Sequence, residues 1–230
     1  SVLFILTINY SNMSHNFRIQ LLIGLSLVLG LFSCTQSPEG KKVEAKDAAK
    51  ITQTSEIVDT LTVDIAASEV SWQGTEPGDE GHNGTLSLKS GVLYVAGEEI
   101  KGGEFVLDMN SINVLDLEGK GKERLEGHLK RNDFFETEKF PEAKFTIASV
   151  VPQDSMYSIK GNLMMKDSVK SIEIPASIMM SENKLEAKTP QFTIDRTQWG
   201  IVFRSGLIGT LKDKLIDDRI GLSVSLVAAK

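Results

Sequence analysis

Apolar and polar residues alternate along four separate segments of this chain, and this alternation constrains the fold more than any other feature of the sequence. The segments are residues 61–65, 105–110, 157–163 and 220–227. Side chains of a β-strand point alternately to the two faces of a sheet, so a period of two predicts strands with one buried face. Several such strands without helices between them favour a sandwich or a closed antiparallel barrel.

Pairs of turn-forming residues separate the alternating segments and predict hairpins between them. These pairs are Asn83-Gly84, Ser90-Gly91, Gly102-Gly103, Gln153-Asp154 and Glu182-Asn183. Residues 121–130 are the best candidate for a short helix, because Leu125 and Leu129 lie four positions apart beside a charged face. No linker rich in Pro or Gly divides residues 61–230, so we expect one all-β domain there with one or two short helices.

The first 33 residues have the pattern of a secretion signal. A start at Met13 is followed by Arg18 and an apolar run over residues 19–32, and residues 1–12 are expected to be an upstream extension of the reading frame. The run is shorter than the ~20 residues that a transmembrane helix requires. It ends in Leu-Phe-Ser-Cys at Cys34, which resembles the lipobox of bacterial lipoproteins. That resemblance implies acylation of Cys34, and the alternative is a buried or free thiol.

Residues 34–60 are expected to be a lipidated cysteine followed by a flexible linker. The stretch from Thr35 to about Thr60 is rich in Lys, Glu, Ala, Ser and Thr, with only scattered apolar residues. Two or more acyl chains give stable attachment to a membrane. The expected location is therefore the bacterial cell envelope, on the periplasmic side or at the cell surface, with residues 61–230 tethered to the membrane through Cys34.

Composition excludes several classes of function. A formal net charge of −6 gives no basic surface for phosphates, so no nucleic-acid partner is expected. One cysteine excludes a disulfide framework and a Cys-rich metal site, and three histidines leave few ligands for any other metal. After processing, His82 and His128 are the remaining histidines, and no Gly-x-Ser-x-Gly motif is present. We therefore assign no catalytic residue, no metal and no cofactor, and do not expect an enzyme.

Two longer motifs carry a family resemblance. They are HLKRNDFF at 128–135, followed by Phe140-Pro141 and a predicted strand at 143–150, and FTIDRTQWGI at 192–201. Together with Gly161-Asn162-Leu163 and the closing strand near 220–228, they resemble the YceI-like family of polyisoprenoid-binding proteins over residues 61–229. The resemblance implies a lipocalin-like antiparallel β-barrel. It also implies an apolar cavity that holds an isoprenoid lipid, such as a quinone or a polyprenyl carrier, for storage, transport or stress protection.

Inward positions of the predicted strands and positions in the two motifs are the candidate binding residues. The cavity candidates are Phe105, Leu107, Met109, Phe145, Ile147, Ile159, Leu163, Phe192, Ile194, Leu222 and Val224. The rim candidates are His128, Phe134, Phe135, Arg196 and Trp199. Four of the rim candidates have a structural alternative: the phenylalanines can plug a barrel end, Arg196 can fix a turn with Asp195, and His128 can bind carbonyls at a helix end.

The sequence is also compatible with a second interpretation of the whole domain. A solidly packed barrel would make the protein a structural or interaction lipoprotein that binds no ligand. Cavity volume separates the two readings, because small barrels either fill with side chains or hold one small ligand. The oligomeric state is also open, with a homodimer as one possibility.

Overall fold

The structure is a computed structural model that describes residues 37–52, 59–76, 81–181, 183–211 and 215–230. The predicted signal sequence and the predicted acylation site at Cys34 lie outside the described residues. Contacts group Thr35–Lys230 into one compact unit. Among the described residues, no helix is both long enough and apolar enough to cross a membrane.

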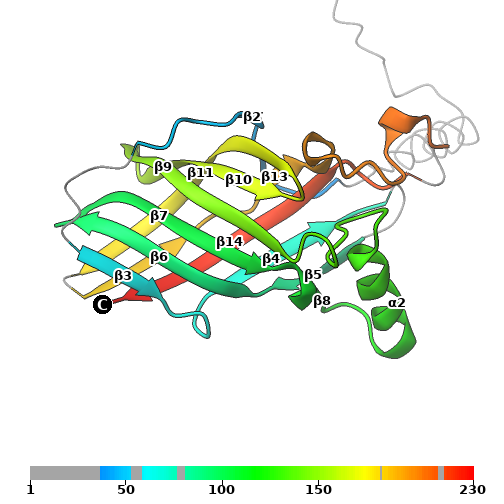
Figure 1. The fold of residues 1–230 in the computed structure, drawn as a ribbon, viewed down its shortest axis with the longest axis horizontal. Helices are drawn as coiled ribbons and strands as arrows, with labels where there is room; N and C mark the ends of the chain where they lie inside the picture. The colour runs from blue at the N-terminus through cyan, green and yellow to red at the C-terminus, as the bar shows by residue number, and fades with distance from the viewer. Residues whose placement is uncertain (1–36, 53–58, 77–80, 182, 212–214) are drawn as a thin grey trace, which may run out of the picture. The chain divides into compact units, whose positions relative to one another are not determined.

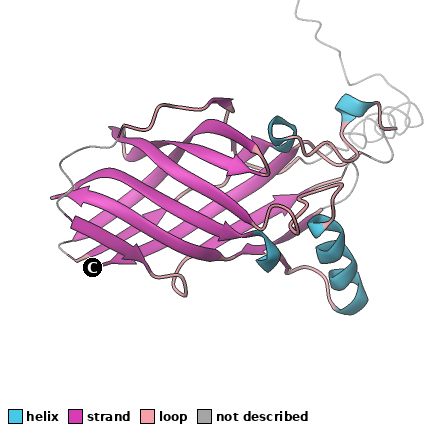
Figure 2. Cartoon of the chain, viewed as in Figure 1, coloured by secondary structure: helices cyan, strands magenta, loops and turns pink. Residues whose placement is uncertain are grey.

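Eight strands of the described chain close into an antiparallel barrel (Figures 1 and 2). In order around the barrel, they are β3 (Asp59–Val63), β6 (Leu88–Ala96), β7 (Glu99–Asp108), β9 (Glu142–Gln153), β10 (Met156–Met165), β11 (Ser168–Ser181), β12 (Lys184–Lys188) and β14 (Arg219–Ala229). The last strand closes the ring, because β14 pairs with β12 on one edge and with β3 on the other. The predicted fold class is confirmed.

Further short strands lengthen the barrel wall at one end. They are β4 (Glu69–Gly74), β5 (His82–Leu86), β8 (Asn113–Val114) and β13 (Phe192–Asp195). β4 and β13 pair with the first half of β14, β5 pairs with β4, and β8 pairs with β5. Each therefore continues a barrel strand or adds to its edge beyond the closed ring.

The two ends of the barrel differ in what covers them (Figure 1). One end, here called the helical end, carries α2 (Gly119–Lys130) and the 3₁₀ turns η2 (Met109–Ser111), η3 (Arg196–Trp199) and η4 (Gly206–Ile208). The other, the hairpin end, carries the β6–β7, β9–β10 and β11–β12 connections. The predicted helix at 121–130 is confirmed and begins two residues earlier.

Three of the five predicted turns are wrong, because their glycines lie inside β5, β6 and β7. A Cβ on Gly84 would lie 2.0 Å from the Asn113 carbonyl oxygen, and one on Gly103 would lie 2.8 Å from the Val92 carbonyl oxygen. Glycine allows neighbouring strands to approach closely at these points. The predicted turn at Gln153-Asp154 is confirmed between β9 and β10. β11 and β12 pair on either side of Glu182-Asn183, but Glu182 lies outside the described residues, so that turn stays a prediction.

Residues 41–49, here called the strap, lie against the barrel and not in the flexible linker expected over 34–60. β1 (Lys41–Lys42) pairs in parallel with β13, and β2 (Lys46–Asp47) pairs with the start of β11. Between them, Val43 is only 5% exposed and joins the core cluster of Ile172 and Phe192. The strap thereby fills the seam between β11 and β13. The linker prediction failed because one buried valine among polar residues produces no periodic signal.

Candidate functional site

Two apolar cavities follow one another inside the barrel. The cavity toward the hairpin end has a volume of about 150 Å³, and the cavity toward the helical end has a volume of about 130 Å³. Both are lined by Val70, Leu107, Leu163 and Leu222, so these side chains form the boundary between them. Together the two volumes approach ~300 Å³, which is the lower end of the range for small-molecule pockets.

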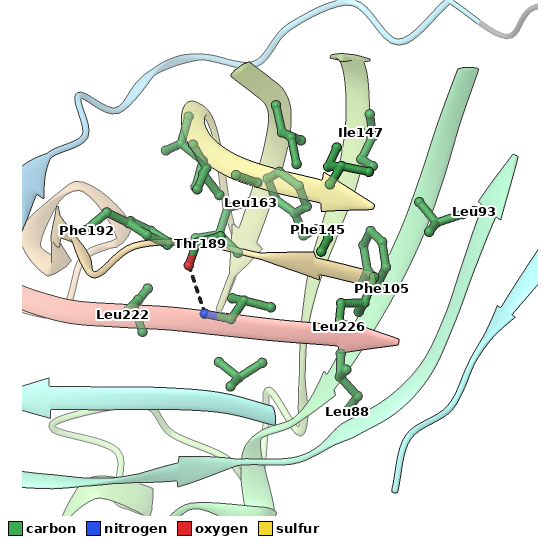
Figure 3. Close-up of a pocket in the computed structure, with 18 of the residues that line it drawn as sticks. Leu88, Leu93, Phe105, Phe145, Ile147, Leu163, Thr189, Phe192, Leu222 and Leu226 are labelled. Carbon is green, nitrogen blue, oxygen red and sulfur yellow. Dashed lines mark hydrogen bonds between the residues drawn. The ribbon is translucent and has the colours of Figure 1, made fainter. Parts of the chain in front are cut away.

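Apolar side chains form almost all of the wall of the hairpin-end cavity (Figure 3). The rings of Phe105 and Phe145 face each other with their centroids 6.5 Å apart. Thr189 is the polar residue of this wall, and its hydroxyl accepts a hydrogen bond of 2.9 Å from the Val224 backbone N–H. No charged side chain lines this cavity. An occupant is therefore selected by shape and by the cost of burying polar groups.

Gly161 gives this cavity part of its shape. A Cβ at this position would lie 2.3 Å from the Phe145 ring and 2.7 Å from the Thr146 carbonyl oxygen. The missing side chain lets the Phe145 ring pack closely against the backbone of β10. A larger residue would displace the ring from this position.

A surface pocket of about 740 Å³ lies at the hairpin end. Its polar lining includes Glu98, Glu99, Lys101 and Tyr157. The pocket and the hairpin-end cavity share Ile100 and Ile178. We call this pocket the mouth, because it places charged and polar groups next to the wall of the apolar cavity.

Arg196 is fully buried at the helical end and holds the chain around it. Its guanidinium donates hydrogen bonds to the carbonyl oxygens of Ile201, Ile216 and Asp217, at 2.7, 3.0 and 3.1 Å, and to the Asp218 carboxylate at 3.2 Å. Burial lowers the pKa of Arg196, and the nearby aspartates oppose that shift. These donors are occupied by the protein, so Arg196 has a structural role although it lines the helical-end cavity.

The other rim candidates also lie inside the helical end. Trp199 is 1% exposed, and its indole N–H donates a hydrogen bond of 3.0 Å to the Leu163 carbonyl oxygen. His128 contacts the rings of Phe203 and Phe134, with centroids 4.8 and 5.8 Å apart, and burial lowers its pKa. Phe134 and Phe135 line the helical-end cavity. Arg196 and Trp199 are therefore buried, and for Arg196 the structure has the hydrogen bonds of the structural alternative; contact of the rim candidates with a ligand stays a prediction.

All eleven cavity candidates lie on the walls of the two cavities. Their contact with a ligand stays a prediction. Further wall residues were not among the predicted ones, namely Val70, Leu88, Leu93, Ile100, Ile172, Ile174, Ala176, Ile178, Leu185 and Leu226. The alternation over residues 172–178 was a readable signal for the β11 members of this set.

We also looked for metal sites and for paired titratable groups among the polar residues outside the cavities. Within the described ranges, no group of three or more His, Cys, Asp or Glu side chains is placed to hold a metal ion. His82 Nδ1 lies 2.7 Å from Asp116 Oδ2 at the exposed surface. Burial alone would raise the pKa of Asp116, but hydrogen bonds from His82 and from the Asn83 N–H lower it. This pair fastens β5 to the segment after β8.

A model of the YceI-like domain family matches residues 61–228. The chain belongs to this family. The predicted family membership is thus confirmed, and the match begins after the strap. A UPF0312 protein of Photorhabdus laumondii is 33% identical over 107 residues, which are 46% of this chain and 48% of that protein. The match therefore spans about half the length of this curated relative.

Two solved structures share the fold of this chain. BcnA of Burkholderia cenocepacia is 16% identical, with a TM-score of 0.55 over 72% of this chain and 98% of that one. A polyisoprenoid binding domain from Saccharophagus degradans, implicated in plant cell wall breakdown, is 14% identical, with a TM-score of 0.57 over 74% of this chain and 97% of that one. At these identities the similarity demonstrates a common fold.

Proposed function

We propose that this YceI-like domain binds an isoprenoid lipid, with the hydrocarbon tail inside the barrel, and stores or transports a quinone or polyprenyl carrier in the cell envelope. The observation that carries the proposal is the pair of consecutive cavities along the barrel, one of them without a charged wall residue. Two apolar cavities in line along the barrel fit the extended shape of a hydrocarbon chain. The shared fold with a polyisoprenoid binding domain supports the same ligand class.

The energetics favour an occupied cavity over an empty one. At ~24 cal/mol per Å³, an empty cavity of about 150 Å³ destabilises a protein by about 3–4 kcal/mol. Burying several hundred Å² of tail at ~25 cal/mol per Å² contributes on the order of 10 kcal/mol, before association costs are subtracted. A bound tail therefore removes a destabilising void and adds favourable burial. A packed structural barrel would have no such void to fill.

The direction of the ligand follows from the difference between the barrel ends. The mouth presents Glu99, Lys101 and Tyr157 beside the cavity. At the helical end, Phe134 and Phe135 line the cavity, and Arg196 donates hydrogen bonds to other groups of the protein. The tail therefore extends from the mouth toward the helical end, with the polar head group at the mouth.

Attachment to the membrane through an acylated Cys34 completes the proposal. The support is the position of the only cysteine directly after an apolar signal core. Cys34→Ser is expected to release the full chain from the membrane fraction. Retention of the substituted protein after a high-salt wash would contradict the anchor and leave the ligand proposal intact.

Lipid extraction tests the ligand proposal directly. The purified full chain is extracted with organic solvent, and the extract is analysed by mass spectrometry. We expect an isoprenoid in an amount close to that of the protein. An extract without isoprenoid, from a protein that also fails to take up added geranylgeraniol, would contradict the proposal and favour the structural alternative.

A further inference from the structure

A short loop at the helical end exposes three large apolar side chains. Leu207, Ile208 and Leu211 are 72%, 59% and 67% exposed, and residues 206–211 carry no charge. Other large exposed apolar residues of the described chain are separated from one another in sequence. Single exposed apolar residues are ordinary, whereas several together on one loop mark a surface that contacts something else. We call residues 206–211 the apolar loop.

A buried base holds the apolar loop in place. The Ser205 hydroxyl accepts a hydrogen bond of 3.1 Å from the Leu207 N–H and donates one of 2.9 Å to the Asp218 carboxylate. That carboxylate also accepts a hydrogen bond from the buried Arg196. Gly209 ends the turn in the left-handed region, where its N–H bonds to the Gly206 carbonyl. The apolar side chains are thus displayed from a fixed support.

The described chain begins beside this same support. The Arg219 guanidinium donates a hydrogen bond to the Ser37 hydroxyl, and Arg219 directly follows Asp218 in the chain. Ser37 lies three positions after Cys34, with Thr35 and Gln36 between them. An extended chain advances ~3.5 Å per residue, so a lipid on Cys34 would be tethered within about 10 Å of Ser37. An anchor at Cys34 therefore brings a bilayer to the helical end.

We propose that Leu207, Ile208 and Leu211 insert into the surface of the bilayer that holds the acyl chains of Cys34. The inference rests on the anchor in the proposed function, and it adds a second point of attachment. An acyl anchor alone fixes distance but leaves orientation free. The apolar loop turns the helical end toward the lipid, so the mouth at the hairpin end faces away from this membrane. Ligand then exchanges with a carrier or membrane on the far side.

A depth measurement at the loop tests the inference. The full chain is prepared with Leu207→Cys, and the new thiol is labelled with an environment-sensitive fluorophore because acylation blocks Cys34. The labelled protein is reconstituted into vesicles of phosphatidylethanolamine and phosphatidylglycerol that carry a nitroxide on their acyl chains. Met179→Cys is the matched control, because Met179 is 64% exposed on β11 toward the hairpin end. We expect severalfold stronger quenching at position 207 than at position 179.

Each other outcome has a defined meaning. Equal quenching at both positions overturns the inference. A change in the emission of the label at position 207 that depends on protein concentration, and not on the nitroxide, also overturns the inference. In that case a second copy of the chain covers the loop. Mass spectrometry of the unsubstituted protein identifies a failed anchor separately. If Cys34 is unmodified, sedimentation with vesicles tests whether the apolar loop inserts by itself. Binding of the parent that is lost in Leu207→Ser/Ile208→Ser/Leu211→Ser supports insertion. A parent that does not bind, or a variant that binds as well as the parent, overturns the inference.

Discussion

Asn162 and Ala49 exchange two hydrogen bonds across 113 residues of sequence. The Asn162 side-chain amide donates to the Ala49 carbonyl oxygen at 2.8 Å, and the Ala49 N–H donates to the Asn162 side-chain oxygen at 2.8 Å. The carboxamide thus replaces a backbone peptide group and fastens the end of the strap to the outer face of β10. A segment outside the family-matched residues 61–228 thereby completes the barrel wall.

Asn162→Ala is expected to loosen the strap. The substitution removes both hydrogen bonds, each of which contributes about 0.5–1.5 kcal/mol net. Amide hydrogen exchange of residues 41–49 should accelerate, while exchange in the barrel strands stays close to that of the parent. Lys160→Ala, at an exposed position on the same strand, is the matched control and should not change strap exchange. Unchanged protection of the strap in Asn162→Ala would contradict its fastening by this pair.

Val43→Ala is expected to lower the free energy of unfolding by about 1–3 kcal/mol, because it removes buried methyl groups from a packed site. Val43 lies in one core cluster with Ile172 and Phe192. Urea denaturation of the full chain measures the change. Val169→Ala on the outer face of β11, where the residue is 41% exposed, should change stability by less than about 0.5 kcal/mol. Equal effects of the two substitutions would show that the strap contributes nothing to the core.

The strands of the barrel could be predicted where the alternation of apolar and polar residues within one segment determines which side chains point inward. Alternation along residues 157–163 gives the inward parity of β10, and the same parity places Ile159 and Leu163 on the cavity wall. Turn prediction failed at Gly84 for the opposite reason. A dipeptide shows which backbone conformations are available, but not that Trp72 and the Asn113 carbonyl approach from other strands.

Cavity volume and the role of Arg196 could not be predicted from the sequence, because both depend on contacts between distant segments of the chain. Volume depends on how side chains of different strands pack together, as Phe105 and Phe145 do across the adjacent strands β7 and β9. The motif around Arg196 marked this residue as a candidate, but it did not show that the side chain is buried. Its hydrogen-bond acceptors lie 5 to 22 residues along the chain, at positions that only the folded loop brings together.

His128 is expected to make the stability of the helical end depend on pH. Burial lowers its pKa from the ordinary 6.5, while Asp133 and Glu76 oppose that shift and Arg131 and Arg204 add to it. The unfolded chain then binds the proton more tightly than the folded chain. Stability is therefore complete above pH ~6.5 and falls as the pH decreases through 6.5 toward the lower folded pKa.

The comparison of the parent with His128→Gln measures this contribution. Urea midpoints are recorded at about pH 7.5 and about pH 5.5, a window that contains the histidine titration. The parent should lose more stability on acidification than the variant, and His82 is present in both proteins. Identical pH dependence in the two proteins would contradict the buried, neutral state of His128.

Ile159→Trp distinguishes a hollow barrel from a packed one. Ile159 lines the hairpin-end cavity and pairs with Ile174 on β11 and Val150 on β9. In a hollow barrel the indole occupies ligand space, so the ligand-free protein should keep its stability within about 1 kcal/mol, while the isoprenoid content of the extract falls. In a packed barrel, overpacking destabilises the protein by about 1–3 kcal/mol. Val169→Trp, on the outer face of β11, is the control and should retain both stability and lipid. A loss of stability in Ile159→Trp, together with a parent protein that never contains isoprenoid, would reject the lipid-binding function and leave the structural lipoprotein as the better account.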